Sequence, residues 1–190
     1  MVQVWKLQTP LGEMAVCERE NFLISLFFPE KAQKLFRYMQ DFSENPDYVW
    51  QCFFNSDFRN SFHFLPYDCV MENSPLIERA CRQLEEYFAG KRTIFNLPLR
   101  PAGSPFQMDV WEAVSRIPYG KTLTYGQIAK RLGMPNAARA VGLAVRSNPL
   151  PILIPCHRVM GAGGRLTGYA GGLEFKKWLL NREGIVYAAE

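Results

Sequence analysis

The chain has 190 residues, of which 48% are hydrophobic, so it can form one large globular domain or two small ones. Its longest apolar runs, such as residues 22–29 and 150–155, are much shorter than the roughly 20 residues of a membrane helix. No basic segment leads into an apolar one at the N-terminus. The sequence therefore predicts neither a membrane protein nor an exported one.

Charge and cysteine content narrow the class of protein only a little. The net charge of +4 and the pI near 8.8 are compatible with a polyanionic partner, but they favour DNA binding only slightly. The five cysteines are an odd number, and none is paired at the short spacing of a zinc site or a redox motif. This pattern suits a reducing compartment, where thiols stay free.

The first 28 residues alternate hydrophobic and polar side chains in three runs, with a turn at Thr9-Pro10-Leu11-Gly12. An antiparallel meander is the simplest interpretation. Residues 29–73 are rich in aromatic side chains but show no sustained period, so no element is predicted there. Ser74-Pro75 then opens a helix, because serine caps and proline suits the first helical position, and Gly90 ends it.

A proline-rich linker at residues 96–103 separates this part from the rest of the chain. The next helix begins at Ser104-Pro105, where Gln107 completes a capping-box pattern. We expect a mixed α+β fold with a domain border near residue 100. Residues 1–100 would form a small N-terminal domain with an antiparallel sheet and a helix. Residues 101–190 would form a mostly helical C-terminal domain with a short active-site strand.

Residues 122–147 predict two helices joined by a tight turn, which is a helix-turn-helix arrangement. Thr124 begins the first helix with a capping-box pattern, and Gly133 ends it. We expect Asn136 to cap the second helix, which should run to Ser147, just before an Asn-Pro pair.

The second of these helices is rich in small residues and carries arginines on roughly one face. From these residues alone, packing against a neighbouring element and close approach to another surface are equally plausible. Gly142 in a helix interior costs up to about 1 kcal/mol relative to alanine, which favours close approach. Apart from Arg139 and Arg146, almost no side chain suits the reading of base edges, so any DNA binding should have little sequence preference.

Cys156 follows an apolar segment and is directly followed by His157 and Arg158. We expect residues 150–155 to be a short strand, stiffened by prolines, that fixes the cysteine as a nucleophile. A free thiol has a pKa of about 8.5, so a catalytic one needs a base or a positive charge nearby. Adjacent residues of an extended segment point to opposite sides, so His157 would need a bend or a bridging water to reach the thiol. The alternative for Cys156 is a buried inert thiol, which is the more common fate of a cysteine.

The last helix is expected at about residues 173–183, with Gly184 as its stop. Glu183 then lies in the last turn, where the helix dipole disfavours a carboxylate by a few tenths of a kcal/mol or more. A glutamate in this position can serve another purpose, such as holding an imidazole in one tautomer. From the residues alone, a surface glutamate offset by Arg182 is the more frequent outcome.

Six blocks of the sequence, in order and at constant spacing, resemble the O6-alkylguanine-DNA alkyltransferase family. They are Tyr125-Gly126-Gln127-Ile128-Ala129, Ala138-Arg139-Ala140-Val141-Gly142, Asn148-Pro149, Pro155-Cys156-His157-Arg158-Val159, Gly168-Tyr169-Ala170-Gly171-Gly172-Leu173, and Leu179-Leu180 followed by Glu183-Gly184. The match is nearly unbroken from about residue 96 to residue 184. Together the blocks strengthen the nucleophile interpretation of Cys156 far beyond what the Cys-His pair supports.

The resemblance implies a direct, stoichiometric and irreversible transfer, in which the damaged guanine leaves the base stack and passes its O6-alkyl group to the cysteine. Cys156 matches the acceptor, His157 the base that acts through a water, and Glu183 the carboxylate that orients the histidine. Tyr125 matches a tyrosine that donates toward the guanine ring and helps to neutralise the leaving base. Asn148 matches an asparagine that braces the active-site turn.

The resemblance also implies a DNA-binding surface and a base pocket. Arg139 matches a finger that fills the gap left by the extruded base, and its helix would enter the minor groove. The other residues expected on this surface are Ala138, Ala140, Gly142 and Arg146. The pocket that selects guanine would consist of Tyr125, Val159, Tyr169 and Ala170.

Toward the N-terminus the resemblance weakens, and residues 29–73 follow no pattern of the family. Some members carry zinc in the smaller domain, but we expect no metal and no cofactor, because no convincing ligand set is found among Cys17, Cys52, Cys69, Cys81 and His63. The expected partner is double-stranded DNA containing O6-alkylguanine, mainly methylated, and O4-alkylthymine remains open as a substrate. We further expect a monomer, with no membrane association, in the cytoplasm of a prokaryote or the nucleus of a eukaryote.

Two other functions fit parts of the same pattern. A non-catalytic protein that only binds the alkylated lesion would keep the DNA-binding surface, but relatives of this kind replace the acceptor cysteine. A Cys-His hydrolase would share the nucleophile, but it would turn over repeatedly and would need an oxyanion hole rather than a base pocket.

Overall fold

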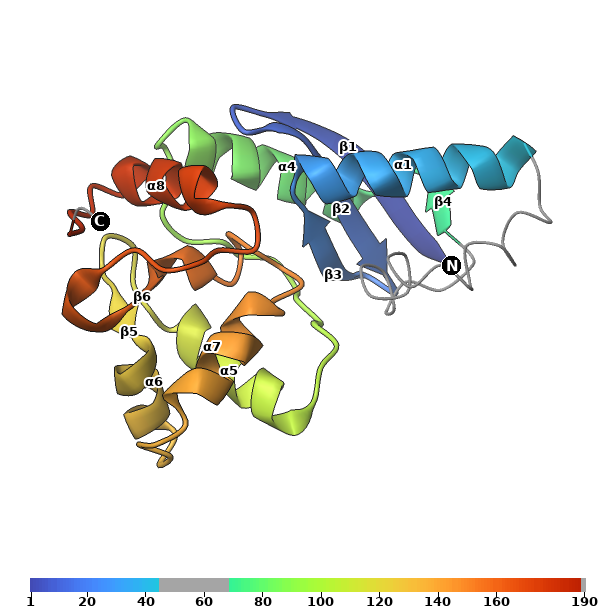
Figure 1. The fold of residues 1–190 in the computed structure, drawn as a ribbon. Helices are drawn as coiled ribbons and strands as arrows, with labels where there is room; N and C mark the ends of the chain where they lie inside the picture. Colours follow the sequence, from blue (N-terminus) through green and yellow to red (C-terminus); the bar gives the residue numbers. More distant parts are fainter. Residues whose placement is uncertain (45–68, 189–190) are drawn as a thin grey trace. The chain divides into compact units, whose positions relative to one another are not determined.

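The structure, a computed structural model, describes residues 1–44 and 69–188 (Figure 1). Internal contacts divide the chain into two compact units, residues 1–85 with 97–100, and residues 86–96 with 101–190. A compact unit of contacts need not fold by itself, so the domain border near residue 100 stays a prediction. Cys52 and His63, two of the residues considered as metal ligands, lie outside the described residues.

The first unit contains a sheet with strand order β3-β2-β1-β4. β1 (Val2–Thr9), β2 (Gly12–Arg19) and β3 (Phe22–Phe27) form the predicted antiparallel meander, and β4 (Cys69–Met71) pairs with β1 in parallel. The first turn is closed by the Thr9 hydroxyl, which donates to the Gly12 carbonyl at 2.7 Å. Gly12 has a φ of +107°, and a Cβ there would lie 2.9 Å from the Pro29 ring, so glycine suits this turn on both counts.

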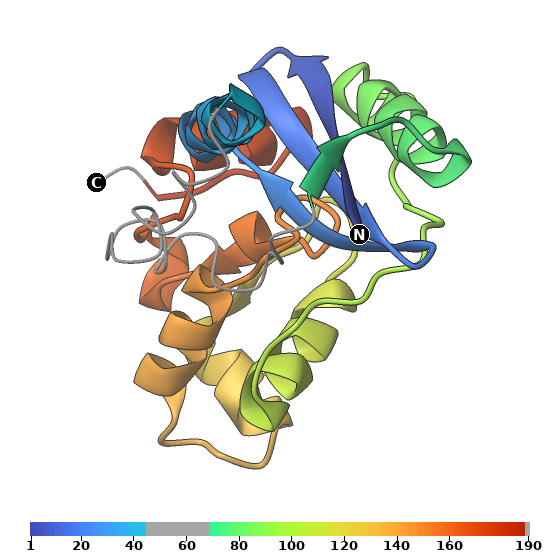
Figure 2. The ribbon, with the colours of Figure 1, turned by 90° about the vertical axis from the view of Figure 1, so that its right-hand side faces the viewer.

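Two helices lie on opposite sides of this sheet, α1 (Pro29–Glu44) and α4 (Pro75–Phe88) (Figure 2). α4 is the helix predicted after Ser74, whose hydroxyl accepts a hydrogen bond from the backbone N–H of Ile77 at 3.0 Å. α1 was not predicted. Its buried Ala32 and Leu35 pack into the cluster formed by the core faces of β1 and β2.

The second unit contains α5 (Pro105–Ser115), α6 (Tyr125–Arg131) and α7 (Ala138–Arg146). The capping boxes predicted at Ser104 and Thr124 are both present, and Gly133, with a φ of +73°, follows the end of α6. The predicted cap at Asn136 is wrong. α7 begins one residue after Ala137, whose methyl side chain cannot accept a hydrogen bond.

α7 presents different residues to the core and to the surface. Val141, Ala144 and Val145 are buried, and the indole N–H of Trp111 on α5 donates to the Ala144 carbonyl at 2.7 Å. The residues exposed on the other face are Arg139, Ala140, Leu143 and Arg146. The small residues of α7 thus serve both packing and an open basic surface.

The strand predicted at residues 150–155 is wrong, because this segment is a tight turn. The N–H of Ile154 donates to the Leu150 carbonyl at 2.8 Å, and Ile152 has a φ of +73°. Asn148 closes the turn, since its amide donates to Ile154 O at 2.9 Å and its Oδ1 accepts from Leu150 N at 3.0 Å. The two prolines of the segment, Pro151 and Pro155, lack the N–H groups that a strand would need.

Cys156 opens a 3-10 helix, η1 (Cys156–Arg158), directly after this turn. The short strand β6 (Val159–Met160) comes next and pairs in parallel with β5 (Leu123–Thr124). The α+β fold class is confirmed, but the strand of the site follows the cysteine instead of preceding it.

A second 3-10 turn, η2 (Ala162–Gly164), and the last helix, α8 (Leu173–Arg182), complete the unit. Lys176, Leu179 and Leu180 form the buried face of α8. No helix of the described ranges, 1–44 and 69–188, is both long enough and apolar enough to cross a membrane.

Candidate active site

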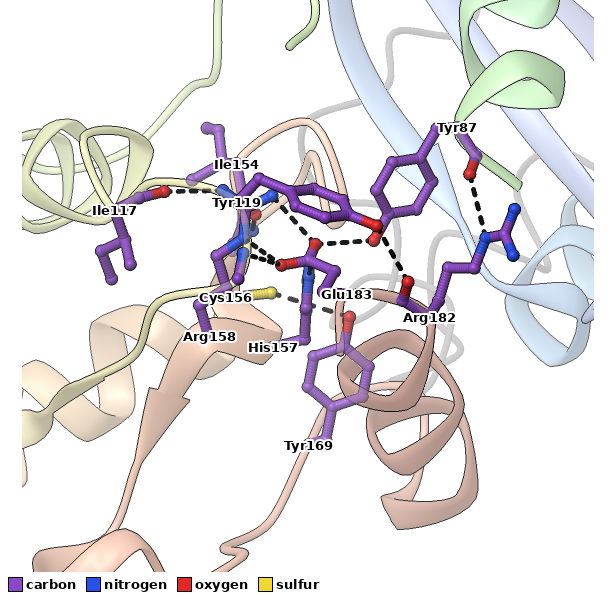
Figure 3. A network of polar contacts seen from close by, with 12 residues as sticks. Tyr87, Ile117, Tyr119, Ile154, Cys156, His157, Arg158, Tyr169, Arg182 and Glu183 are labelled. Carbon is purple, nitrogen blue, oxygen red and sulfur yellow. Dashed lines mark hydrogen bonds and ion pairs between the residues drawn. The ribbon is translucent and has the colours of Figure 1, made fainter. Parts of the chain in front are cut away.

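Glu183 is the centre of a buried polar network at the end of α8 (Figure 3). Only 5% of the residue is exposed, so it is not the surface glutamate that the sequence alone favours. Its Oε1 lies 2.8 Å from Nε2 of His157. The Arg158 guanidinium donates to both carboxylate oxygens, from Nε to Oε2 at 2.8 Å and from Nη2 to Oε1 at 2.9 Å.

Two further donors complete the surroundings of this carboxylate. The Tyr87 hydroxyl donates to Oε1 at 2.8 Å, and the backbone N–H of Gly120 donates to Oε2 at 3.2 Å. Burial by itself raises the pKa of Glu183, but hydrogen bonds from His157 and Arg158 outweigh it and lower the pKa to about 2. The group is therefore a carboxylate at any physiological pH.

The Glu183 carboxylate determines the tautomer of His157. An ionised carboxylate can only accept hydrogen bonds, so the proton of the neutral ring lies on Nε2 and the lone pair on Nδ1. Of the buried side-chain nitrogen and oxygen atoms in the described part of the chain, Nδ1 of His157 is the one without a hydrogen-bond partner. Burial lowers the pKa of His157, although Glu183 opposes this effect, so the ring is neutral with a free basic nitrogen.

Arg158 pairs with Glu183 rather than serving as a direct positive neighbour of the thiol. Its Nη1 also donates to the Ile117 carbonyl at 2.6 Å, and the residue is buried. A planar guanidinium matches a carboxylate with two parallel bonds, which a lysine cannot do. The pair places one positive and one negative charge together, so the ionised Glu183 is compensated without a charged His157.

Cys156 is 4% exposed at the start of η1, and its Sγ donates to the Tyr169 hydroxyl at 3.9 Å. Burial raises the pKa of the thiol, while its hydrogen-bonding interactions with Asn148 and Tyr169 and the charge of Lys176 lower the pKa. The resting group is a thiol surrounded by groups that favour its ionised form. Losing the proton to a nearby base would make it a nucleophile.

A second group of expected residues surrounds an open pocket of about 470 Å³. Tyr125, Arg139, Ala138 and Gly142 line it, together with Thr124, Gly126 and Ala162. The Tyr125 hydroxyl lies 3.0 Å from Thr167 Oγ1, and a Cβ on Gly142 would lie 3.7 Å from the Tyr125 ring. Within this unit, the surface that the backbone of Gly142 approaches is therefore the ring of Tyr125.

The structure places the remaining expected residues apart from this pocket. Ala140 and Arg146 lie on the exposed face of α7, Val159 is fully buried in β6, and Ala170 is exposed. Among residues 1–44 and 69–188, no three His, Cys, Asp or Glu side chains are grouped so as to hold a metal ion.

Two buried polar residues near the site were not predicted from the sequence, namely Tyr87, which binds Glu183, and Lys176, whose charge acts on Cys156. Both lie on the buried faces of helices, where the pattern predicts apolar side chains. For Lys176 the sequence does hold one signal, because its spacing from Leu179 and Leu180 places it on the apolar face of the last helix. A lysine is almost never fully buried without a partner, so a lysine on that face indicates a polar partner inside the fold.

The second unit combines a helix-turn-helix pair with a cysteine next to a neutral, carboxylate-bound histidine, an arrangement that suits a DNA-binding enzyme with a reactive thiol. Two family models match the chain and together cover most of it. Residues 5–101 match the ribonuclease-like domain of 6-O-methylguanine DNA methyltransferase, and residues 105–185 match its DNA binding domain. The chain belongs to the 6-O-methylguanine DNA methyltransferase family, whose members act in DNA repair by alkyl transfer.

Individual relatives support the same assignment. The constitutive methylated-DNA--protein-cysteine methyltransferase of Bacillus subtilis is 41% identical over 182 residues, which cover 95% of this chain and 94% of the relative. The methylated-DNA--protein-cysteine methyltransferase of Methanosarcina acetivorans is 55% identical over 117 residues, 62% of this chain and 75% of the relative. The structure of Mycobacterium tuberculosis OGT in complex with DNA matches with a TM-score of 0.75 and 34% identity, over 95% of this chain and 92% of that one.

Proposed function

We propose that this protein repairs DNA by moving an alkyl group, mainly methyl, from O6 of guanine to Sγ of Cys156. The new bond joins sulfur to the alkyl carbon as the bond from that carbon to O6 breaks, and the electron pair of the broken bond stays on the guanine. The thioether is inert, so each chain acts once. The observation that carries this proposal is the free, buried Nδ1 of His157 in the residue next to Cys156.

The proton of the thiol has a defined destination in this scheme. It passes through a bridging water to Nδ1 of His157, since the ring already donates from Nε2 to Glu183. The imidazolium that forms then faces a carboxylate with a pKa of about 2, which stabilises the new positive charge. Tyr169 would donate to the ionised sulfur, and Tyr125 would donate toward the leaving guanine.

The exposed face of α7 is the proposed contact with DNA. Its small residues allow close approach to a minor groove, while Arg139 and Arg146 contact the backbone and the space of the displaced base. Extruding the damaged base has an unstacking cost of a few kcal/mol, which Arg139 would partly offset by filling the gap. The pocket beside Tyr125 and Gly142 would receive the extruded nucleotide.

The remaining assignments follow from the same chemistry. One chain carries the whole network, so we expect a monomer that binds duplex DNA containing O6-alkylguanine. It would work where DNA is found, in the cytoplasm of a prokaryote or the nucleus of a eukaryote. O4-alkylthymine presents a similar alkyl ether, so it is included as a second substrate for the experiment.

Intact-protein mass spectrometry tests the proposal. The protein is incubated with duplex DNA carrying one O6-methylguanine, with undamaged duplex as control, and parallel reactions use O4-methylthymine and ethyl or benzyl groups. We expect one added methyl mass per chain, located on Cys156 by peptide mapping, and no further reaction. Cys156→Ala should stay unmodified while it still binds DNA.

Two other results would overturn the proposal. An unchanged mass together with tight binding of the damaged duplex would indicate a lesion-binding protein. An unmodified protein that releases product repeatedly would indicate a hydrolase.

A further inference from the structure

Lys176 is a buried charged residue that the scheme above does not use. It lies on α8, and only 1% of it is exposed. Taking an ammonium group out of water is costly unless strong hydrogen bonds replace the lost hydration. Such a lysine, on the face that otherwise carries Leu179 and Leu180, calls for a specific role.

The Lys176 ammonium bridges two backbone segments of the site. Its Nζ donates to the Val159 carbonyl at 2.7 Å and to the Thr167 carbonyl at 3.4 Å. Val159 directly follows η1, which holds the acceptor cysteine, and Thr167 lies two residues before Tyr169. The Thr167 hydroxyl in turn lies 3.0 Å from the hydroxyl of Tyr125.

The same ammonium also acts on the thiol through its charge. Burial lowers the pKa of Lys176 to about 8, and the interaction with Cys156 opposes this decrease, so the amine is mostly protonated at neutral pH. Its charge lowers the pKa of Cys156, and it also lowers that of His157.

Other ionisable groups act on the same sulfur or its base. On η1 they are His157 and Arg158, on the loop before α8 Tyr169, and at the end of α8 Glu183. Arg158 and Glu183 compensate each other, so Lys176 contributes a positive charge that no carboxylate of this network neutralises.

We propose that Lys176 is a positioning residue of the transfer, which holds the acceptor segment against the loop that carries Tyr169 and favours the ionised sulfur of Cys156. This inference rests on the proposed function, because it assigns Lys176 to the same acceptor site. The ammonium supplies both effects from one position. A neutral side chain of the same length would lose both, whereas a charged replacement would keep the second.

The test compares Lys176→Met with Lys177→Met, which removes a lysine from the next position of the same helix, where it pairs with exposed Glu174. The first-order rate of methyl transfer at saturating DNA and the affinity for undamaged duplex are measured for both. Reaction of Cys156 with iodoacetamide is followed across pH by peptide mass spectrometry, which gives the ionisation midpoint of the thiol.

We expect Lys176→Met to slow transfer about tenfold to a hundredfold, the range for a small misplacement of a reacting group. The thiol midpoint should move to higher pH, while DNA affinity stays unchanged. Lys177→Met should match the wild type in all three measurements. A residue that only stabilises the fold would lower the melting temperature without moving the midpoint, and that result would overturn the inference.

Two more comparisons separate this inference from the proposed function and from a folding defect. If the wild type takes up no methyl group, the proposed function fails, and the iodoacetamide midpoint alone decides on Lys176. If circular dichroism shows that Lys176→Met does not fold, Lys176→Arg and Lys176→Gln replace it. The arginine variant should keep a midpoint near that of the wild type and the glutamine variant should raise it, and equal midpoints would contradict a role for the charge.

Discussion

Nε2 of His157 lies 2.8 Å from Oε1 of Glu183, and both side chains are fully buried. The two residues are 26 positions apart in the sequence, and the end of α8 brings them together. Because the carboxylate also binds Arg158 through both of its oxygens, it is fixed in orientation as well as in charge. The orientation of the histidine ring, and with it the availability of Nδ1, depends on this one carboxylate.

Replacing Glu183 by glutamine should impair both activity and stability. The amide cannot balance the Arg158 charge, and breaking a buried ion pair by removing one partner typically costs about 3–5 kcal/mol. The histidine would also lose the group that fixes its tautomer, so methyl transfer should slow by about a hundredfold or more. Urea unfolding and single-turnover transfer measure the two effects. Glu174→Gln, which changes an exposed residue on the same helix, should alter neither activity nor stability. If Glu183→Gln transferred methyl at the wild-type rate, the carboxylate would have no part in the mechanism.

Stability should fall in two stages as the pH decreases. The pKa of His157 is lowered in the folded state, so below its ordinary value near 6.5 the unfolded chain takes up a proton that the folded chain resists. The pKa of Glu183 is lowered from 4.5 to about 2, so its contribution, about 3 kcal/mol in total, is complete above 4.5 and is lost as the pH falls toward 2. Urea unfolding from pH 8 to pH 3 should show both stages, and Glu183→Gln should flatten the lower one. A stability that rises on acidification would contradict these assignments.

Tyr87 and Tyr119 offer a matched pair for the hydroxyl that reaches Glu183. Tyr87 donates to the carboxylate at 2.8 Å, whereas Tyr119 donates to the Arg182 carbonyl at 2.8 Å. Tyr87→Phe should destabilise the fold by about 1–3 kcal/mol, since a hydrogen bond to a charged group is lost. It should also shift the pH profile of methyl transfer, because the carboxylate that faces His157 loses a donor. Tyr119→Phe should leave that profile in place, and identical profiles for both variants would show that Tyr87 is structural only.

Arg139 should matter for duplex DNA far more than for the free base. It lies exposed on α7 beside the pocket of Tyr125, so it is placed to fill the gap of an extruded nucleotide. Arg139→Ala is expected to slow repair of an O6-methylguanine duplex by about tenfold or more, because part of an unstacking cost of a few kcal/mol is no longer offset. Reaction with the free base should remain near the wild-type rate. Arg116→Ala, which removes an exposed arginine at the C-cap of α5 that pairs with Glu112, serves as control. Equal slowing on both substrates would rule out the finger role.

Local signals predicted the elements whose ends are determined by neighbouring residues. Ser104 with Gln107 and Thr124 with Gln127 form capping boxes because each pair closes within a single turn of helix. α1 escaped prediction because its apolar residues, Ala32 and Leu35, begin a longer aromatic-rich stretch without a sustained period. Residues 150–155 were wrongly predicted as a strand, because a short apolar run with prolines on both sides is typical of one. In the structure Asn148 supplies the hydrogen bonds that make this segment a turn.

The sequence predicted only those residues of the site that lie in the motifs of the family. Cys156, His157 and Glu183 were predicted together because the resemblance to a family linked their blocks, whereas the residues alone favoured a surface role for Glu183. The residues around Arg158 in the sequence do not indicate that its guanidinium binds the carboxylate of Glu183, which is 25 positions away. Pairing between polar side chains far apart in the sequence leaves no periodic pattern. The contacts of Tyr87 and Lys176 are therefore known only from the folded chain.

Nitrogen NMR of the His157 ring can show whether Glu183 leaves Nδ1 as a free base beside Cys156, the step on which the proposed transfer depends. The chain has only two histidines, so a His63→Gln variant assigns the signals. At neutral pH we expect a protonated Nε2 and an unprotonated Nδ1, and we expect this pattern to be lost in Glu183→Gln. A proton on Nδ1, or a fully charged ring at neutral pH, would contradict it.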